Sequence, residues 1–131
     1  MYVSIISGHD AAQYSPVTLA YVGDSVYELM VRSRLILEGD RRIEDFHKRT
    51  VGFVRSEAQK AAIEKLIPVL HEDEMAIVRR GRNAKNTVSR NAASHRIATG
   101  LEALLGYLYL TGKFDRINEL FEKIISDIND M

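Results

Sequence analysis

The sequence contains no cysteine, and only two of its 131 residues are proline. The lack of cysteine excludes a disulfide framework, a thiol nucleophile and any cysteine-ligated zinc or iron–sulfur site. It also suits a reducing compartment, so we expect a cytoplasmic protein. Because proline interrupts helices, its scarcity leaves room for long ones.

Long apolar runs are lacking as well. No run is long enough to span a bilayer, and the first residues, MYVSIISGHD, do not have a basic start followed by a long apolar stretch. We therefore expect no membrane association. The length fits one domain, and 46% hydrophobic with 27% charged residues is typical of a globular protein.

Acidic residues are absent from one long stretch of the chain. The formal net charge is zero, but no Asp or Glu lies between Met75 and Leu101. The basic residues in that stretch are Arg79, Arg80, Arg82, Lys85, Arg90 and Arg96. Because the local field decides what a surface attracts, this segregation matters more than the net charge.

The middle of this basic stretch, residues 81–93, predicts a loop that binds a phosphate backbone. It has no sustained apolar period and is rich in Asn, Ser and Thr, including Asn83. Such side chains donate hydrogen bonds to phosphate and sugar oxygens, while Arg and Lys neutralise phosphates. The absence of aromatic residues argues against stacking on single-stranded bases and favours a duplex. The alternative is a solvated loop whose arginines pair with the acidic residues after Gly112.

Helical periodicity covers most of the chain, and no strand pattern is present. Ser15 and Pro16 predict the start of a helix that ends before Gly39. The other helices are expected over residues 40–53, 54–66, 71–80, 94–112 and 115–128. We therefore predict one all-α domain, a helical bundle over residues 15–131, preceded by a loosely ordered arm over residues 1–14.

Two carboxylates are expected on buried helices. The segment Ser94 to Leu110 is apolar on most sides, which predicts the central helix, and Glu102 is its single carboxylate. Asp24 follows Gly23 in the first long helix, and a glycine there predicts close packing against its backbone. If the two carboxylates converge, they form an oxygen-rich site that suits Mg²⁺ or Mn²⁺. The alternative is that each pairs with an arginine such as Arg32 or Arg96.

Four tyrosines, Tyr21, Tyr27, Tyr107 and Tyr109, are interpreted as core and dimer packing. Glu28 lies one turn beyond Asp24, which makes it a weaker candidate for a supporting role beside the carboxylates.

Three stretches carry a resemblance to a known family. LAYVGDSVYELMVR (Leu19 to Arg32) resembles the signature helix of the ribonuclease III family, and ATGLEALLGYLYL (Ala98 to Leu110) resembles its second catalytic helix. RRGRNAK (Arg79 to Lys85) resembles the small bacterial branch, Mini-ribonuclease III, which consists of the catalytic domain alone. The resemblance extends from about Ser15 to about Ile125.

The resemblance implies a dimeric, all-α endoribonuclease that cleaves double-stranded RNA with Mg²⁺, for which Mn²⁺ can substitute. Asp24 and Glu102 match the catalytic, metal-binding residues of the family. By the same resemblance, the products are 5′-phosphate and 3′-hydroxyl ends and the substrate is precursor 23S ribosomal RNA. Whether a ribosomal protein assists is left open.

Two positions depart from the wider family in a way that resembles the Mini branch. Ala20 and Thr99 stand where the family usually has a Glu and an Asp, respectively. The site therefore has fewer carboxylates, which puts a two-metal arrangement in doubt, and Thr99 is expected only to support Glu102.

Two other functions stay open from the sequence. One is a non-catalytic RNA-binding or ribosome-assembly module with the same fold. The other is a helical metal phosphohydrolase that acts through His9 and Asp10, since an HD pair is the metal-binding hallmark of one such family. On an arm without helical pattern, a solvated pair is the preferred interpretation.

Overall fold

The computed structural model describes residues 4–84 and 92–126, without the side chains of residues 92–98. Over these ranges the chain is helical and contains no strand. The elements are α1 (Gly8–Ala12), α2 (Pro16–Leu37), α3 (Ile43–Val54), α4 (Ser56–Leu66), the short 3₁₀ helix η1 (Ile67–Val69), α5 (Glu72–Arg82), α6 (Ala92–Leu110) and α7 (Phe114–Ser126).

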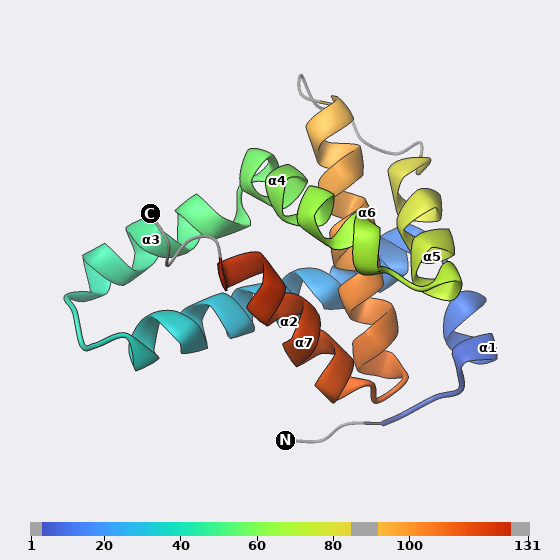
Figure 1. The fold of residues 1–131 in the computed structure, drawn as a ribbon, viewed down its shortest axis with the longest axis horizontal. Helices are drawn as coiled ribbons and strands as arrows, with labels where there is room; N and C mark the ends of the chain where they lie inside the picture. Colours follow the sequence, from blue (N-terminus) through green and yellow to red (C-terminus); the bar gives the residue numbers. More distant parts are fainter. Residues whose placement is uncertain (1–3, 85–91, 127–131) are drawn as a thin grey trace.

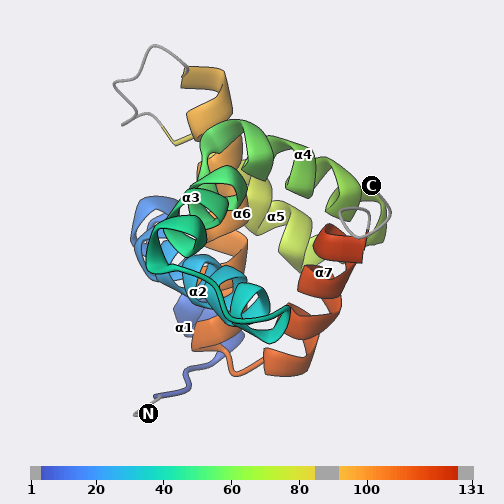
Figure 2. The same ribbon diagram turned by 90° about the vertical axis from the view of Figure 1, so that its left-hand side faces the viewer.

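The predicted all-α domain is confirmed, and α6 is its central helix. Figure 1 shows α6 running through the middle of the molecule, with α2 crossing behind it and α5 alongside. Figure 2 shows the same helices from the side, where α4 and α7 lie to one side of α6, and α7 also packs against α2 through the ring contact of Phe121 with Tyr27. Leu101, Leu104, Leu105 and Leu108 of α6 are all buried. Burial on every side explains why this helix is apolar almost all round.

The ends of the two principal helices follow local rules. The Ser15 hydroxyl accepts the backbone N–H of Thr18 at 3.1 Å, and Pro16 occupies the first turn of α2. At the other end of the core, Gly112 has a φ of 72° and ends α6, and the N–H of Lys113 donates to the Leu108 carbonyl at 2.9 Å. This 6→1 bond satisfies a carbonyl that the end of the helix would leave free.

The N-terminal segment differs from a loosely ordered arm over the residues that the structure describes. It contains α1, which the periodicity did not indicate, and Ala11 is fully buried. The N–H of Ile6 donates to the Leu110 carbonyl at 2.8 Å, so the segment is tied to the end of α6. These contacts order a helix that is too short to be stable alone.

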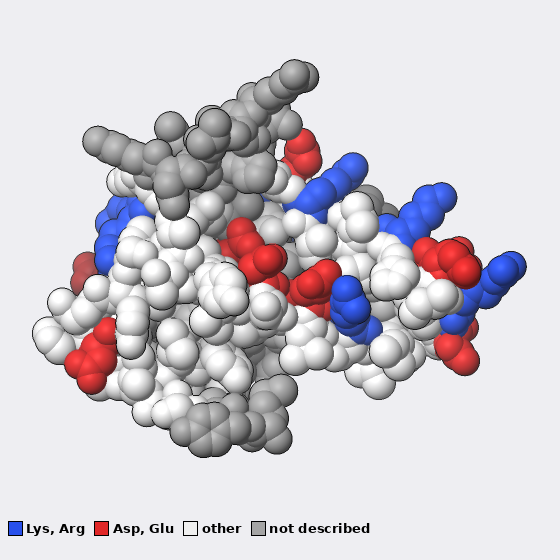
Figure 3. Space-filling model, turned by 180° about the vertical axis from the view of Figure 1, so that it is seen from behind, with Lys and Arg blue, Asp and Glu red and all other residues white. Residues whose placement is uncertain are grey.

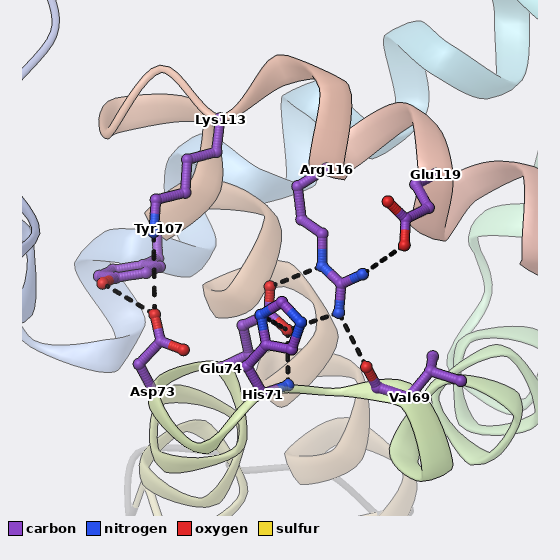
Figure 4. Close-up of polar contacts among 8 residues, drawn as sticks. All are labelled: Val69, His71, Asp73, Glu74, Tyr107, Lys113, Arg116 and Glu119. Atoms are coloured by element: carbon purple, nitrogen blue, oxygen red, sulfur yellow. Dashed lines mark hydrogen bonds and ion pairs between the residues drawn. The ribbon is translucent and has the colours of Figure 1, made fainter.

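A buried ion pair joins α5 to α7 (Figure 4). The side chain of Glu74 is almost fully buried, and its carboxylate accepts hydrogen bonds from Arg116 at 2.8 and 2.9 Å. Arg116 also donates to the Val69 carbonyl at 2.8 Å. Burial is the largest single influence and opposes the charged form, but the hydrogen bonds and charges of Arg116 and His71 together outweigh it and lower the pKa of the Glu74 carboxyl. The pair fixes the start of α5 to the start of α7.

Over the described ranges, none of the helices combines the length and the apolar character that crossing a bilayer requires.

Candidate active site

Two glycines let α2 and α6 touch backbone to backbone. A Cβ atom on Gly23 would lie 1.6 Å from the Glu102 carbonyl oxygen, so no residue with a side chain fits at this position. A Cβ atom on Gly106 would lie 1.9 Å from the Leu19 carbonyl oxygen. The close approach predicted from Gly23 therefore occurs, and it is made on both helices. Gly106 was not singled out in the sequence, although a second glycine inside a strongly apolar helix carries the same signal.

This crossing brings Asp24 and Glu102 together. Asp24 follows Gly23 and is exposed, whereas Glu102 is only partly exposed. Burial, a hydrogen bond with Asp24 and repulsion from the Asp24 charge raise the pKa of Glu102 from 4.5 to about 8. Two carboxylates in contact cannot both ionise cheaply, so without a cation the protonated form of Glu102 is favoured at neutral pH.

The donor set of this pair fits a hard divalent cation. Carboxylate oxygens are the ligands that Mg²⁺ and Mn²⁺ prefer, and a cation there would replace the proton on Glu102. Among the ion pairs formed by the described residues, none places a Lys or Arg on either carboxylate. No group of three or more potential ligands occurs in the described part of the chain. A cation held by Asp24 and Glu102 would therefore complete its coordination with water and phosphate oxygens.

The two weaker site candidates lie beside this pair. Glu28, one turn beyond Asp24, accepts a hydrogen bond from Arg32 at 3.2 Å. Arg32 therefore pairs with Glu28 and does not neutralise Asp24. Thr99 is partly buried one turn before Glu102. The side chain of Arg96, the other arginine considered as a partner, lies outside the described residues.

The predicted RNA-binding residues are only partly within the described structure. Arg79, Arg82 and Asn83 are exposed at the end of α5, which runs two residues further than predicted. Arg80 is partly buried. Lys85 and Arg90, and with them most of the predicted loop, lie outside the described residues, as does the side chain of Arg96.

The face that carries Asp24 also presents apolar residues. Figure 3 shows acidic side chains near the middle of the rear face, with a broad uncharged surface below them. Tyr21 is 82% exposed and Leu29 53% exposed, both on α2. A groove of about 420 Å³ runs beside Asp24 and is also lined by Val26 and Tyr109. Of the four tyrosines interpreted as packing, Tyr27 and Tyr107 are buried in this chain, whereas Tyr21 is free to contact a partner.

Comparison with known proteins assigns the family. Residues 17–113 match the ribonuclease III domain. A Mini-ribonuclease 3 of Thermoanaerobacter is 40% identical over 88% of this chain and 84% of its own length. One from Synechocystis is 48% identical over 84% of this chain and 77% of its own length. The chain belongs to the Mini-ribonuclease 3 branch of the ribonuclease III family.

A solved structure supports the same fold for this Mini-ribonuclease 3 branch member. A crystal structure of a Fusobacterium nucleatum protein superposes with a TM-score of 0.80 at 29% identity. The superposition covers 87% of this chain and 95% of the Fusobacterium chain.

Membership of the Mini-ribonuclease 3 branch makes the protein an endoribonuclease. Ribonuclease III enzymes act on RNA, generally depend on a divalent metal and generally work as dimers. His9 and Asp10 lie outside the matched residues and are exposed on α1. The phosphohydrolase alternative thus gains no support from the family match.

Proposed function

We propose that the protein cleaves double-stranded RNA with Mg²⁺, for which Mn²⁺ can substitute, and that Asp24 and Glu102 are its catalytic, metal-binding residues. The observation that carries this is the contact between the two carboxylates where α2 crosses α6. A raised pKa caused by burial and a like charge is typical of sites built to bind a cation or to move a proton.

In this proposal the chain supplies a rigid pair of ligands. A divalent cation there would activate a water molecule and neutralise charge on the scissile phosphate. Asp24 and Glu102 would hold the cation at one position, because the backbone contact at Gly23 and Gly106 leaves the helices little freedom to shift. In-line attack on phosphorus would displace the 3′ oxygen and leave a 5′-phosphate and a 3′-hydroxyl. Glu28 and Thr99 would support the pair from one turn away.

The RNA would be held through its backbone. We assign phosphate contacts to Arg79, Arg82 and Asn83 at the exposed end of α5 and to Lys85, Arg90 and Arg96, which follow in the sequence. A-form RNA presents phosphates and 2′-hydroxyls where its bases are poorly accessible, which suits side chains of this kind.

A homodimer would place two sites on one duplex. The exposed Tyr21 and Leu29, with the partly exposed Val22 and Val26, form an apolar face on α2 directly beside Asp24. A two-fold interface on this face would present two carboxylate pairs, one for each strand.

We further propose precursor 23S ribosomal RNA as the substrate and the cytoplasm as the compartment. The resemblance of RRGRNAK to the small branch supports the substrate, and the absence of cysteine is compatible with the compartment. Cleavage of this RNA with and without ribosomal proteins would show whether one of them assists.

The first test is incubation of the purified protein with a long double-stranded RNA, with Mg²⁺ or with EDTA. We expect cleavage only with Mg²⁺, and a loss of at least a thousandfold in Asp24→Asn, because one of the two ligands is removed. Asp10→Asn on the exposed face of α1 is the matched control and should cleave as the wild type does.

Two outcomes would contradict the assignment. Cleavage that survives in Asp24→Asn would show that the carboxylate pair is not catalytic, and loss in Asp10→Asn would favour the phosphohydrolase alternative. Duplex binding without any cleavage, including that of precursor 23S ribosomal RNA, would favour the non-catalytic module.

A further inference from the structure

The last turn of α5 is fixed to the beginning of α2 by one arginine. Both terminal nitrogens of Arg80 donate hydrogen bonds, to the Ala12 carbonyl and to the Tyr14 carbonyl, each at 2.9 Å. Ala12 is the last residue of α1, and Tyr14 directly precedes Ser15, the cap of α2. The front edge of the guanidinium fork therefore faces backbone, where it satisfies two carbonyls outside helical hydrogen bonding.

The same turn is fixed to α6 by a pair of glycines. A Cβ atom on Gly81 would lie 2.7 Å from the Gly100 Cα atom, and one on Gly100 would lie 3.0 Å from the Val78 carbonyl oxygen. The two backbones are thus in direct contact. Gly100 is two residues before Glu102, a rise of about 3 Å along the helix axis.

Arg79 and Arg82, in contrast, are exposed. The Cγ atom of Arg82 would be only 3.2 Å from a Cβ on Gly100, so its aliphatic stem lies against α6 within one turn of Glu102. Of four successive residues, Arg80 and Gly81 therefore face the protein, whereas Arg79 and Arg82 are exposed to solvent.

We propose that Arg80 is a positioning residue rather than an RNA contact. Together with Gly81, it fixes Arg79 and Arg82 relative to both helices that carry the catalytic carboxylates. This inference rests on the proposed cleavage of double-stranded RNA. Fixing the phosphate-binding arginines in this way sets where the scissile phosphate lies relative to Asp24 and Glu102. A displacement of about 1 Å at such a site can cost a hundredfold in rate.

The test separates binding from positioning by three measurements on purified variants. They are the slope of log Kd for duplex RNA against log salt, kcat at saturating RNA, and the rise in Tm on adding Mg²⁺. Arg82→Met and Arg79→Met should each flatten the salt slope by roughly 1, because each removes one phosphate contact.

Arg80→Met should leave the salt slope as in the wild type and lower kcat about tenfold to a hundredfold. Its rise in Tm with Mg²⁺ should persist, since the carboxylate pair is intact. Arg80→Lys, which can still reach one carbonyl, should recover part of the lost kcat. Gly81→Ala should lower kcat in the same way without adding or removing any charge.

Each contrary result has a distinct meaning. A salt slope in Arg80→Met that flattens as in Arg82→Met would make Arg80 a phosphate contact and overturn the proposal. Unchanged kcat in both Arg80→Met and Gly81→Ala, with only a lower Tm, would show that the contacts serve stability alone. A wild-type protein that neither binds nor cuts the duplex would overturn the proposed function itself, whatever the variants do.

Discussion

At the scale of single residues, the site is destabilised by its own charge. Burial and the neighbouring Asp24 raise the pKa of Glu102 to about 8, well above the ordinary carboxyl value of 4.5. Between about pH 4.5 and pH 8, Glu102 is therefore protonated in the folded protein but ionised in the unfolded chain. The contribution of Glu102 to the unfolding free energy is fully present below this pH range and is lost as the pH rises through it.

We expect Glu102→Gln to be more stable than the wild type at pH 9, by about 2 kcal/mol after allowance for the exposed part of the side chain. At pH 4.5 the two should be similar, because glutamine resembles the protonated carboxyl in shape and can also donate to Asp24. Urea denaturation in EDTA at both pH values measures the difference. Glu28→Gln, which loses only an exposed pair with Arg32, is the control and should change little. Equal stability of Glu102→Gln and wild type at pH 9 would contradict the raised pKa of Glu102.

At the scale of helices, packing depends on glycines whose surroundings differ. Gly23→Ala would place a methyl group inside the Glu102 carbonyl, so α2 and α6 would have to separate. We expect a loss of more than about 3 kcal/mol in unfolding free energy, because the principal contact of the core opens. Gly52→Ala on α3 meets nothing within 4 Å and should gain up to about 1 kcal/mol from helix propensity. Equal urea midpoints for the two variants would contradict the crossing.

The helices that the sequence predicts well are those fixed by local signals. Ser15, Pro16 and Gly39 marked both ends of α2, and the apolar period of residues 94–110 marked the central helix. The short helix α1 could not be predicted, since its order comes from the bonds of Ile6 and Arg80 to distant residues.

The site shows the same division between local and distant information. Gly23 and Gly106 each carry the sequence signal of a close backbone approach, but that the two glycines face each other follows only from the fold. Sequence composition likewise grouped Arg80 with the exposed arginines, because no local pattern distinguishes a guanidinium that faces backbone carbonyls from one that faces solvent.

At the scale of the whole molecule, the apolar face of α2 should decide the oligomeric state. Tyr21 and Leu29 expose large apolar side chains next to Asp24, and truncating such anchors at an interface typically costs 2 kcal/mol or more each. The double variant Tyr21→Ala with Leu29→Ala should therefore weaken a dimer by at least about a hundredfold while the monomer stays folded. Analytical ultracentrifugation across micromolar concentrations would measure the change in mass.

The matched control for this face lies on α3, where Ile43 and Val51 are similarly exposed. Alanine at both positions should leave a dimer intact, so that a mass change confined to the α2 variant locates the interface. If the two carboxylate pairs act on opposite strands, the monomeric variant should nick duplex RNA where the wild type cuts both strands. If the wild type is monomeric, or if the α2 substitutions leave a dimer unaffected, the two strands would be cut in separate binding events. A nicked intermediate would then accumulate in the wild type as well, which a time course on denaturing and native gels would show.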